Sequence, residues 1–363
     1  MTSPLKAILL RLHWPLCISA LLISLLGLWN QVGGEGMRDM SRGQGTWLLL
    51  GGCVFLLISL LDTQLIRRWS LLFYGASVGL LLLVLMIGKR INGSQRWIHL
   101  GAFSLQPSEV AKVSVILMVA AYLYRNQRRE PLDLRQLIPL AGLIFPPAFL
   151  IFREPDLGQT LLLLLTVGTM ILFESIERRT LWGLFSAGIL LIPFAWRFLL
   201  HDYQIGRVLT LVDGAADRLG SGWHAHQAEI AVGHGGLFGH GHGLGSQISG
   251  GFLPEYHTDF VFAKLCEEHG FLGGVLLLSL YFVLLLSIIH CASHARDHYI
   301  RQLSIGVGAL FFWHITLNIG MVLGLLPVTG VTLPLMSYGG SSTVTSCFAL
   351  GVVMSGHTCR LKI

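Results

Sequence analysis

The chain has 363 residues, of which 53% are hydrophobic and only 12% are charged, and its mean hydropathy is +0.67. Soluble domains carry about 25% charged residues, so this composition excludes a globular protein surrounded by water. The net charge of +6 does not indicate nucleic-acid binding, because the basic residues cluster in short segments between apolar runs, where they set membrane topology. The six cysteines form no CxxC pair and indicate free thiols.

A helix that crosses a bilayer needs about 20 mostly apolar residues. Ten segments come close to this requirement, and they cover residues 10–29, 46–62, 70–88, 107–124, 137–152, 157–173, 180–199, 269–289, 303–326 and 340–356. Lys6 and Arg11 precede the first segment and no small-residue cleavage site follows it, which predicts a retained span. The expected fold is an all-α polytopic membrane protein, with residues 1–363 as a single integral membrane domain.

The even number of spans places both termini on one side of the membrane. Of the 25 Lys and Arg residues, 14 fall in segments on the side of the termini and nine on the other side, which favours cytoplasmic termini. The segment 200–268 is then one large periplasmic loop, rich in Gly and His and ordered against the membrane body. Pro146 and Pro147 predict a broken helix in a packed position, because such backbone needs partners inside a membrane.

Polar residues gather at the outer end of the span at 107–124. Pro107 suits a first helical turn, and Glu109 suits the positive end of a helix. Gln106, Glu109 and Lys112 are spaced three apart and share one face. Ionisable side chains at this depth are costly, so Glu109 and Lys112 are either a packing pair or site residues. Trp97, beside Arg96, is typical of an interfacial anchor.

A short outer corner, Arg153-Glu154-Pro155-Asp156, joins the next two spans. Asp156 either caps the helix that begins near Leu157 or contacts a substrate, and the residues leave both readings open.

The segment 252–260 leads into a helix that is predicted to start at His257 or Thr258 and to end at Gly270. Asp259 is expected in the first turn, between apolar neighbours, which makes it a candidate general base. A simple capping role is the alternative. Apolar neighbours raise the pKa of a carboxyl and a helix start lowers it, so the sign of the shift stays open.

Five histidines of the large loop, His224, His226, His234, His240 and His242, include two HxH spacings of the kind found in zinc sites. No cysteine or carboxylate is expected to complete a tight cluster with them, so we predict no metal ligands here. Residues 239–243 are interpreted as a flexible loop over the site.

A further polar set begins with Asn318 and continues in the segment 326–342. This segment contains two prolines and three glycines between Leu326 and Gly340, which favours a re-entrant outer loop with buried backbone. Open amides and hydroxyls near Gly339–Ser342 could receive an anion such as a pyrophosphate. An ordinary turn is the alternative.

These motifs, in this order, resemble the SEDS family of shape, elongation, division and sporulation proteins over nearly the whole chain. The matching segments are Gln95-Arg96-Trp97, Gln106-Pro107-Ser108-Glu109, Pro155-Asp156-Leu157-Gly158, Phe252-Leu253-Pro254-Glu255, His257-Thr258-Asp259-Phe260, Pro334-Leu335 and Ser337-Tyr338-Gly339-Gly340-Ser341. The short N-terminus and His201-Asp202-Tyr203-Gln204 with Arg207 resemble the elongation branch, RodA, more than the division branch, FtsW. His234 and His240 stand where the family pattern has a small residue and a lysine.

The resemblance implies a ten-helix inner-membrane peptidoglycan glycosyltransferase with a periplasmic active site. Its substrate would be lipid II, a disaccharide-peptide on undecaprenyl pyrophosphate, and its protein partner a class B penicillin-binding protein of the elongation machinery. Asp259 would take the proton from the acceptor 4-hydroxyl. Cations stabilise the charge that develops on a leaving pyrophosphate, and a divalent ion such as Mg²⁺ or Mn²⁺ would do the same. The residues assigned to substrate binding are Arg96, Trp97, Gln106, Ser108, Glu109, Lys112, Arg153, Asp156, Arg207, His257, Ser337, Gly339, Gly340 and Ser341.

Two other functions fit parts of the pattern. A lipid II flippase would also carry charges within spans and broken helices, although it should show polar groups through the midplane and on both faces. A non-catalytic scaffold that recruits a transpeptidase would keep its function without Asp259.

Overall fold

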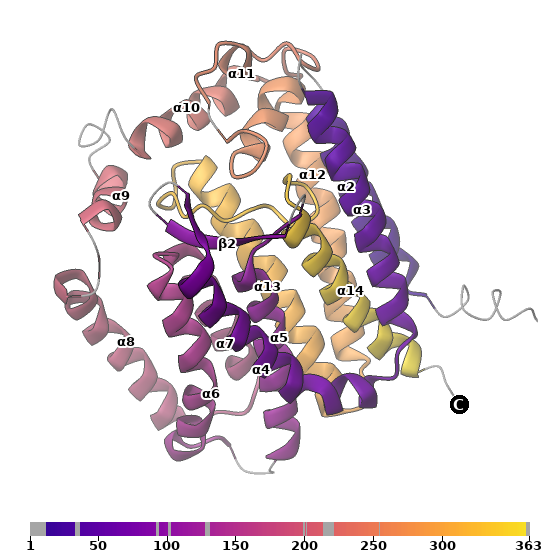
Figure 1. Cartoon of the computed structure of the whole chain (residues 1–363), viewed down its shortest axis with the longest axis vertical. Helices are drawn as coiled ribbons and strands as arrows, with labels where there is room; N and C mark the ends of the chain where they lie inside the picture. Colours follow the sequence, from indigo (N-terminus) through magenta and orange to yellow (C-terminus); the bar gives the residue numbers. More distant parts are fainter. Residues whose placement is uncertain are drawn as a thin grey trace, which may run out of the picture.

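The computed structural model describes residues 12–32, 37–91, 94–100, 103–127, 131–198, 200, 202–212, 221–253 and 255–360. Ten long helices form the body of the molecule, and each one overlaps a predicted span (Figure 1). They are α2 (Trp14–Val32), α3 (Met37–Leu60), α4 (Thr63–Ile87), α5 (Pro107–Arg125), α6 (Leu134–Arg153), α7 (Leu157–Leu172), α8 (Arg178–Phe198), α12 (Val261–Ser293), α13 (His298–Val322) and α14 (Gly340–Arg360). The polytopic helical fold is confirmed.

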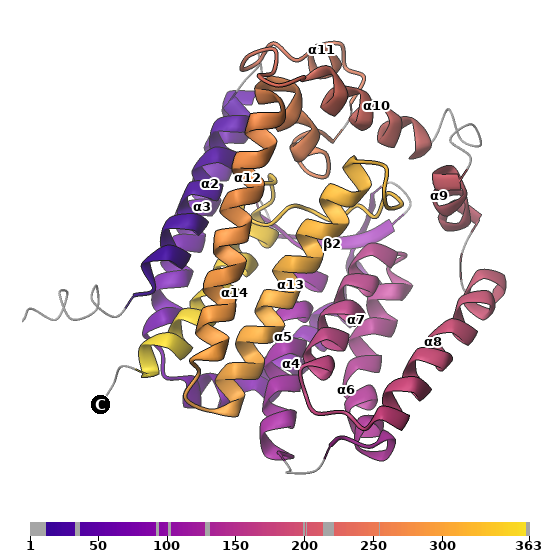
Figure 2. The ribbon, with the colours of Figure 1, turned by 180° about the vertical axis from the view of Figure 1, so that it is seen from behind.

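Eight of these helices are long and apolar enough to cross a membrane. The other two are α7, which is apolar but shorter, and α14, which carries more small and polar residues. Buried side chains concentrate on α5 and α13, which lie at the centre of the bundle. Helix α8 stands apart from the bundle in both views (Figures 1 and 2), and its described side chains are exposed except for Thr180. Its apolar surface therefore suits contact with lipid.

The all-α prediction misses a small sheet between α4 and α5. Strands β1 (Lys89–Ile91), β2 (Ser94–Leu100) and β3 (Phe103–Leu105) pair antiparallel in the order β1-β2-β3. Lys89 pairs with Trp97, and Ile98 pairs with Leu105. This segment is too short and too polar to cross the bilayer, so its backbone groups pair locally instead.

The expected break at Pro146 and Pro147 is wrong, because α6 runs without interruption from Leu134 to Arg153. Pro147 has no N–H to offer the carbonyl of Leu143, four residues earlier. The Tyr74 hydroxyl of α4 donates to that carbonyl at 2.7 Å. A neighbouring helix thus satisfies the freed backbone group, which confirms the packed position that the prolines predicted.

The large loop between α8 and α12 contains three short helices, α9 (Asp202–Val212), α10 (Ser221–His234) and α11 (Ser246–Ser249). Helix α12 starts at Val261, eight residues before the predicted span and inside the predicted loop. Gly270 marks a kink with φ of 65°, as its predicted helix-ending role requires. A Cβ at Gly270 would also lie 2.5 Å from the Leu237 carbonyl, so the loop packs where only glycine fits.

Both ends of the described chain lie at the same end of the bundle. His13, just before α2, donates its backbone N–H to Met354 Sδ of α14, and its ring centroid lies 5.2 Å from that of His357. The large loop, the sheet and the segment 323–339 lie at the opposite end (Figure 1). The even number of spans is consistent with this arrangement.

Candidate active site

The segment around Asp259 and the loop between α13 and α14 are joined by backbone contacts. Ser337 Oγ donates to the Thr258 carbonyl at 2.6 Å, and the Tyr338 N–H donates to the His257 carbonyl at 2.8 Å. Asn318 Nδ2 on α13 donates to the carbonyls of Asp259 and Val331, at 2.8 and 2.7 Å. The α13–α14 loop is mostly buried, as the re-entrant prediction requires.

Asp259 itself lies just before the start of α12. Phe260 is the N-cap and Val261 the first helical residue, so the expectation that Asp259 occupies the first turn is wrong. Its side chain is half-buried, and a methyl group placed on Gly330 would lie 3.5 Å from Asp259 Oδ2. Burial raises the pKa of Asp259 to about 7, helped by Glu255 and Asp156 and opposed by Arg207 and Arg96. The sequence left open whether the pKa of Asp259 is raised or lowered, and in the folded protein it is raised.

The corner between α6 and α7 forms a second wall of the site. Arg96 of β2 donates through Nε to the Glu154 carbonyl at 3.2 Å and through Nη2 to the Pro155 carbonyl. Its Nη1 lies 3.4 Å from Asp156 Oδ2. Asp156 also accepts from the Gln159 N–H at 3.2 Å, so the capping reading is confirmed. The sheet is therefore bound to the corner by one guanidinium.

Glu154 is fully buried in this corner, and neither of its carboxylate oxygens has a hydrogen-bond partner among the described residues. Burial and the nearby Asp156 raise the pKa of Glu154 to about 9. This carboxyl is therefore neutral at pH 7. Arg153, the last residue of α6, is exposed and has no ion pair within the described ranges.

Helix α9 contributes one cation to the site. Arg207 Nη1 donates to the Val328 carbonyl at 2.9 Å, which attaches α9 to the α13–α14 loop. The other residues that favoured the elongation branch are not tested, because His201 and the side chains of Asp202 and Tyr203 lie outside the described residues.

Gly158, in the first turn of α7, allows the corner to approach the α13–α14 loop. A Cβ at this position would lie 2.2 Å from the Thr329 carbonyl oxygen, so any side chain must push the two segments apart. At Gly168 in the same helix, a Cβ would meet open space, with no neighbouring atom within 4 Å.

We therefore expect Gly158→Ala to lower the activity of the site and the midpoint of thermal unfolding. Gly168→Ala should leave both unchanged or raise stability slightly, because alanine favours a helix by about 1 kcal/mol over glycine. Activity assays and unfolding curves of both purified variants test this. Equal activities and equal unfolding midpoints of the two variants would show that the close approach at Gly158 does not contribute to activity or stability.

Glu109 and Lys112 belong to a buried polar cluster between α5, α7 and α13. Lys112 Nζ contacts Glu109 Oε1 at 2.9 Å, Gln159 Oε1 at 2.6 Å and His314 Nε2 at 2.9 Å. Gln159 Nε2 donates to Glu109 Oε1 at 3.1 Å. An ammonium can only donate, so His314 Nε2 accepts, and its Nδ1–H donates to the Thr332 carbonyl at 3.0 Å.

All three donors of Lys112 are thus used within the protein, and its side chain is 1% exposed. Lys112 therefore does not reach a substrate pyrophosphate in this structure. The cluster instead connects α5 and α7 to Thr332 of the α13–α14 loop. Gln106, expected on the same face, is the N-cap residue of α5 without a side-chain capping bond, and its backbone N–H donates to Ser341 Oγ at 3.1 Å.

Contacts within the protein also occupy the polar groups that were expected to bind a pyrophosphate. Ser337 Oγ accepts from the Leu333 N–H in addition to its bond to Thr258. Ser341 Oγ donates to the Ser104 carbonyl at 2.9 Å, and the Gly339 N–H donates to Gln44 Oε1 at 3.2 Å. A Cβ at Gly340 would lie 2.6 Å from Trp47. These contacts bind the loop to β3, to α3 and to the segment of Asp259, and they leave fewer of its polar groups for a pyrophosphate.

The remaining predicted residues lie around the same end of the bundle. Trp97 is half-buried in β2, and Ser108 is fully buried with no partner for its hydroxyl among the described residues. His257 Nε2 lies 3.8 Å from Glu255 Oε2, and burial lowers the pKa of His257. No contact in the described residues joins Trp97 or Ser108 to Asp259.

Several residues of the site were missed in the sequence. His314 is one of them, although it stands four residues before Asn318, which the sequence does indicate, and this spacing predicts one polar face of the apolar span α13. Gln31 and Gln44 donate to the carbonyls of Met336 and Ser337, at 3.2 and 3.3 Å. Both glutamines lie near the outer ends of their helices, where polar residues are common. Their positions in the sequence therefore do not indicate that they bind the α13–α14 loop.

The loop histidines do not form one group. His234 and His240 stack at 4.4 Å between ring centroids, and His226 lies beside Glu229. The expectation that no carboxylate completes a cluster is wrong for His242, whose Nδ1 lies 3.1 Å from Glu268 Oε2. His269 is the third member of that group, which does not include Asp259.

Comparison with known proteins identifies the relatives of this fold and site. The family model of the FtsW, RodA and SpoVE cell cycle proteins matches residues 7–360. The Escherichia coli K12 peptidoglycan glycosyltransferase MrdB is 39% identical over 350 residues, which cover 94% of this chain and 92% of the relative.

Two solved structures are similar over nearly their whole length. A chain of a peptidoglycan synthase complex that coordinates polymerization and crosslinking has a TM-score of 0.84 at 31% identity, covering 97% of this chain and 99% of its own. Thermus thermophilus RodA has a TM-score of 0.72 at 30% identity, covering 97% and 98%. The family resemblance of the motifs is confirmed, and the chain belongs to the FtsW/RodA/SpoVE family, the SEDS proteins.

Proposed function

We propose that this chain is a peptidoglycan glycosyltransferase that polymerises lipid II, with Asp259 as general base. The observation that carries the proposal is the half-buried Asp259 carboxyl with its pKa near 7, facing the α13–α14 loop near Gly330. A general base works best when its pKa lies near the working pH. The relatives named peptidoglycan glycosyltransferases support the reaction class.

The chemistry needs one proton transfer and one displacement. Asp259 takes the proton of the acceptor 4-hydroxyl as that oxygen forms a bond to the anomeric carbon of the donor. The bond from that carbon to the undecaprenyl pyrophosphate breaks, and the pyrophosphate leaves with the electron pair. Of the cations expected to stabilise it, Arg153 is exposed, and Arg207 is half-buried with Nη1 bound to the Val328 carbonyl. Arg96 is bound to the corner at Asp156, and Lys112 is fully buried. We assign the pyrophosphate contact to Arg153 and Arg207.

We also propose that the site faces the periplasm and both termini face the cytoplasm, because the basic residues favour the side of the termini. A class B penicillin-binding protein is the proposed partner, supported by the similar chain in a complex that coordinates polymerization and crosslinking. The likeness to MrdB, at 39% identity over 94% of this chain, and to RodA supports a role in elongation.

The test is glycan polymerisation in detergent, with purified protein alone and with its transpeptidase partner. Lipid II is supplied, moenomycin silences contaminating classical glycosyltransferases, and a gel resolves glycan chains by length. In a micelle there are no two leaflets to exchange between, so long chains indicate a polymerase. A folded complex that forms no chains, but moves lipid II across the bilayer of a vesicle, would support the flippase reading instead.

The pH dependence of polymerisation follows from the raised pKa of Asp259. The base must be ionised, so below about pH 7 the rate should fall about tenfold per pH unit. Glu255 raises this pKa, so Glu255→Gln should shift the acidic limb to lower pH. Because the Glu255 side chain is 56% exposed, the shift should shrink at high salt. An acidic limb that is unchanged in Glu255→Gln at low salt would argue against Asp259 as the titrating group.

A further inference from the structure

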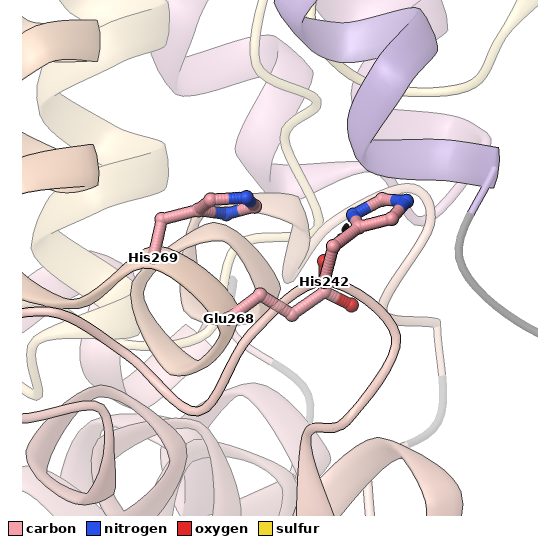
Figure 3. A group of neighbouring side chains, drawn as sticks. All are labelled: His242, Glu268 and His269. Atoms are coloured by element: carbon pink, nitrogen blue, oxygen red, sulfur yellow. Dashed lines mark hydrogen bonds and ion pairs between the residues drawn. The ribbon is translucent and has the colours of Figure 1, made fainter.

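A compact group of potential metal ligands lies outside the site described above. His242 of the loop, and Glu268 and His269 of α12, offer one ligand atom each, and these atoms all lie within 4.8 Å of one another (Figure 3). Figure 3 shows the three side chains converging from the loop and the helix. His242 precedes Glu268 by 26 positions and His269 by 27 positions. The fold therefore brings the three residues together, and no local spacing in the sequence does so.

The His242–Glu268 pair already has a geometry close to that of two ligands of one ion. His242 Nδ1 lies 3.1 Å from Glu268 Oε2, and Glu268 is 1% exposed. Two ligand atoms on a tetrahedral zinc ion, with bonds of about 2.1 Å, are roughly 3.4 Å apart. Lys264 Nζ lies 3.7 Å from the other oxygen, Oε1, so the carboxylate presents Oε2 to the histidines.

His269 supplies the independent observation that points to a ligand. Both of its ring nitrogens are buried and make no well-formed hydrogen bond among the described residues, where the Leu265 carbonyl is the nearby backbone acceptor. A buried polar atom without a partner costs about 1–3 kcal/mol, and coordination would relieve that cost. Trp29 of α2 packs against both histidine rings, at 5.0 Å from His242 and 4.6 Å from His269, which limits their movement.

We propose that His242, Glu268 and His269 bind a borderline divalent transition-metal ion, with Zn²⁺ as the expected occupant. Two imidazoles and one carboxylate suit Zn²⁺ and leave a fourth position for water. Mg²⁺ prefers an octahedral shell of oxygens and is not expected to bind. The ion would join the loop at His242 to α12, which the loop already contacts through the His240 and Gly241 N–H groups donating to the Glu267 and Glu268 carbonyls.

The test measures Zn²⁺ bound to the whole purified chain, prepared without a polyhistidine tag and dialysed against low free Zn²⁺. The variant His242→Phe/His269→Phe keeps two aromatic rings against Trp29 and removes two ligands. The matched control is His290→Phe/His294→Phe, which removes two exposed neighbouring histidines from the last turn of α12 and its C-cap. Glu268→Gln is avoided, because it would leave the buried Lys264 without its partner.

Wild type and the control are expected to retain about one more Zn²⁺ per chain than the site variant. Their unfolding midpoint should rise with Zn²⁺ and not with Mg²⁺, and the affinity of the site variant should be at least tenfold lower. Equal Zn²⁺ content and equal midpoint shifts in the site variant and wild type would overturn the proposal, as would the absence of bound Zn²⁺ in wild type. Neither readout depends on glycosyl transfer, so failure here is separate from failure of the proposed function.

Discussion

The Asp259→Asn protein is expected to polymerise lipid II about 10²–10⁴-fold more slowly than wild type, which is the usual contribution of a general base. Asparagine has nearly the same shape but cannot take up the proton of the acceptor hydroxyl. The backbone carbonyl that Asn318 contacts is unchanged by the substitution, so the fold should persist. Steady-state rates over a range of lipid II concentrations should show the loss in kcat, with little change in KM.

The matched control is Glu255→Gln, which neutralises a second carboxylate four residues away. The Glu255 side chain is 56% exposed and accepts a hydrogen bond from Thr258 Oγ1 at 3.1 Å, which glutamine can also accept. It should keep a wild-type maximal rate above the acidic limb. Chains of normal length and yield from Asp259→Asn would remove Asp259 from the chemistry and favour another base. Glu109 is a poor second base, because Lys112 and Gln159 both bind its Oε1.

Replacing Lys112 by Met should destabilise the protein by about 3–5 kcal/mol, because it leaves the buried Glu109 carboxylate without its cation. Glu109 is 3% exposed and Lys112 is 1% exposed, so water cannot replace the lost partner. The same substitution removes the donor to His314 Nε2 and loosens the contact of that ring with Thr332. Activity should therefore fall as well, through displacement of the α13–α14 loop.

The double variant Glu109→Gln/Lys112→Met provides the control. Removing both charges should restore much of the lost stability, since burying a neutral side chain costs far less than burying an unpaired charge. Unfolding midpoints of the wild type, the two single variants and the double variant form a complete cycle. If the double variant is no more stable than Lys112→Met alone, the ion pair is not what holds the cluster together. Activity that stays low in a stable double variant would show that the charges serve the reaction as well as the fold.

The positions of the ten long helices could be predicted from apolar runs, because a membrane span requires a length of apolar chain that soluble structure seldom needs. The segment 137–152 shows the limit of this argument. Its two prolines predicted a break, yet α6 is continuous, because the hydroxyl of Tyr74 replaces one missing backbone donor. Tyr74 belongs to another helix, α4, so no local pattern around the prolines predicts its contact.

Short elements escaped prediction for a related reason. The strands β1–β3 span three to seven residues each, which is too short for a period-two pattern to stand out. The first part of α12 was predicted as a separate short helix that starts at His257 or Thr258, whereas α12 starts at Val261 and continues through the kink at Gly270. Packing of the loop against Gly270 holds the two parts in one element.

The sequence motifs located the candidate site, and the tertiary structure showed which contacts each of its residues makes. Asp259, Asp156 and Arg96 come from three distant segments, and the sequence indicated each one as an outer polar residue. Only the fold shows that Arg96 binds the corner at Asp156. Only the fold shows, too, that Lys112 donates its hydrogen bonds to neighbours within the protein, which are Glu109, Gln159 and His314. Charge and burial at Asp259 depend on those neighbours, so its raised pKa could not be read from residue order.

The sequence by itself therefore determined that the protein lies in a membrane, the number of its long helices, its family and the outer polar segments that form the site. These properties depend on composition and local spacing. Tertiary structure alone decided which polar groups are used up in holding the fold, as for Ser337 and Lys112, and which remain available, as for Arg153. The reason is that a hydrogen bond or an ion pair needs two partners within about 3–4 Å, and segments far apart in the chain meet at that distance only after folding.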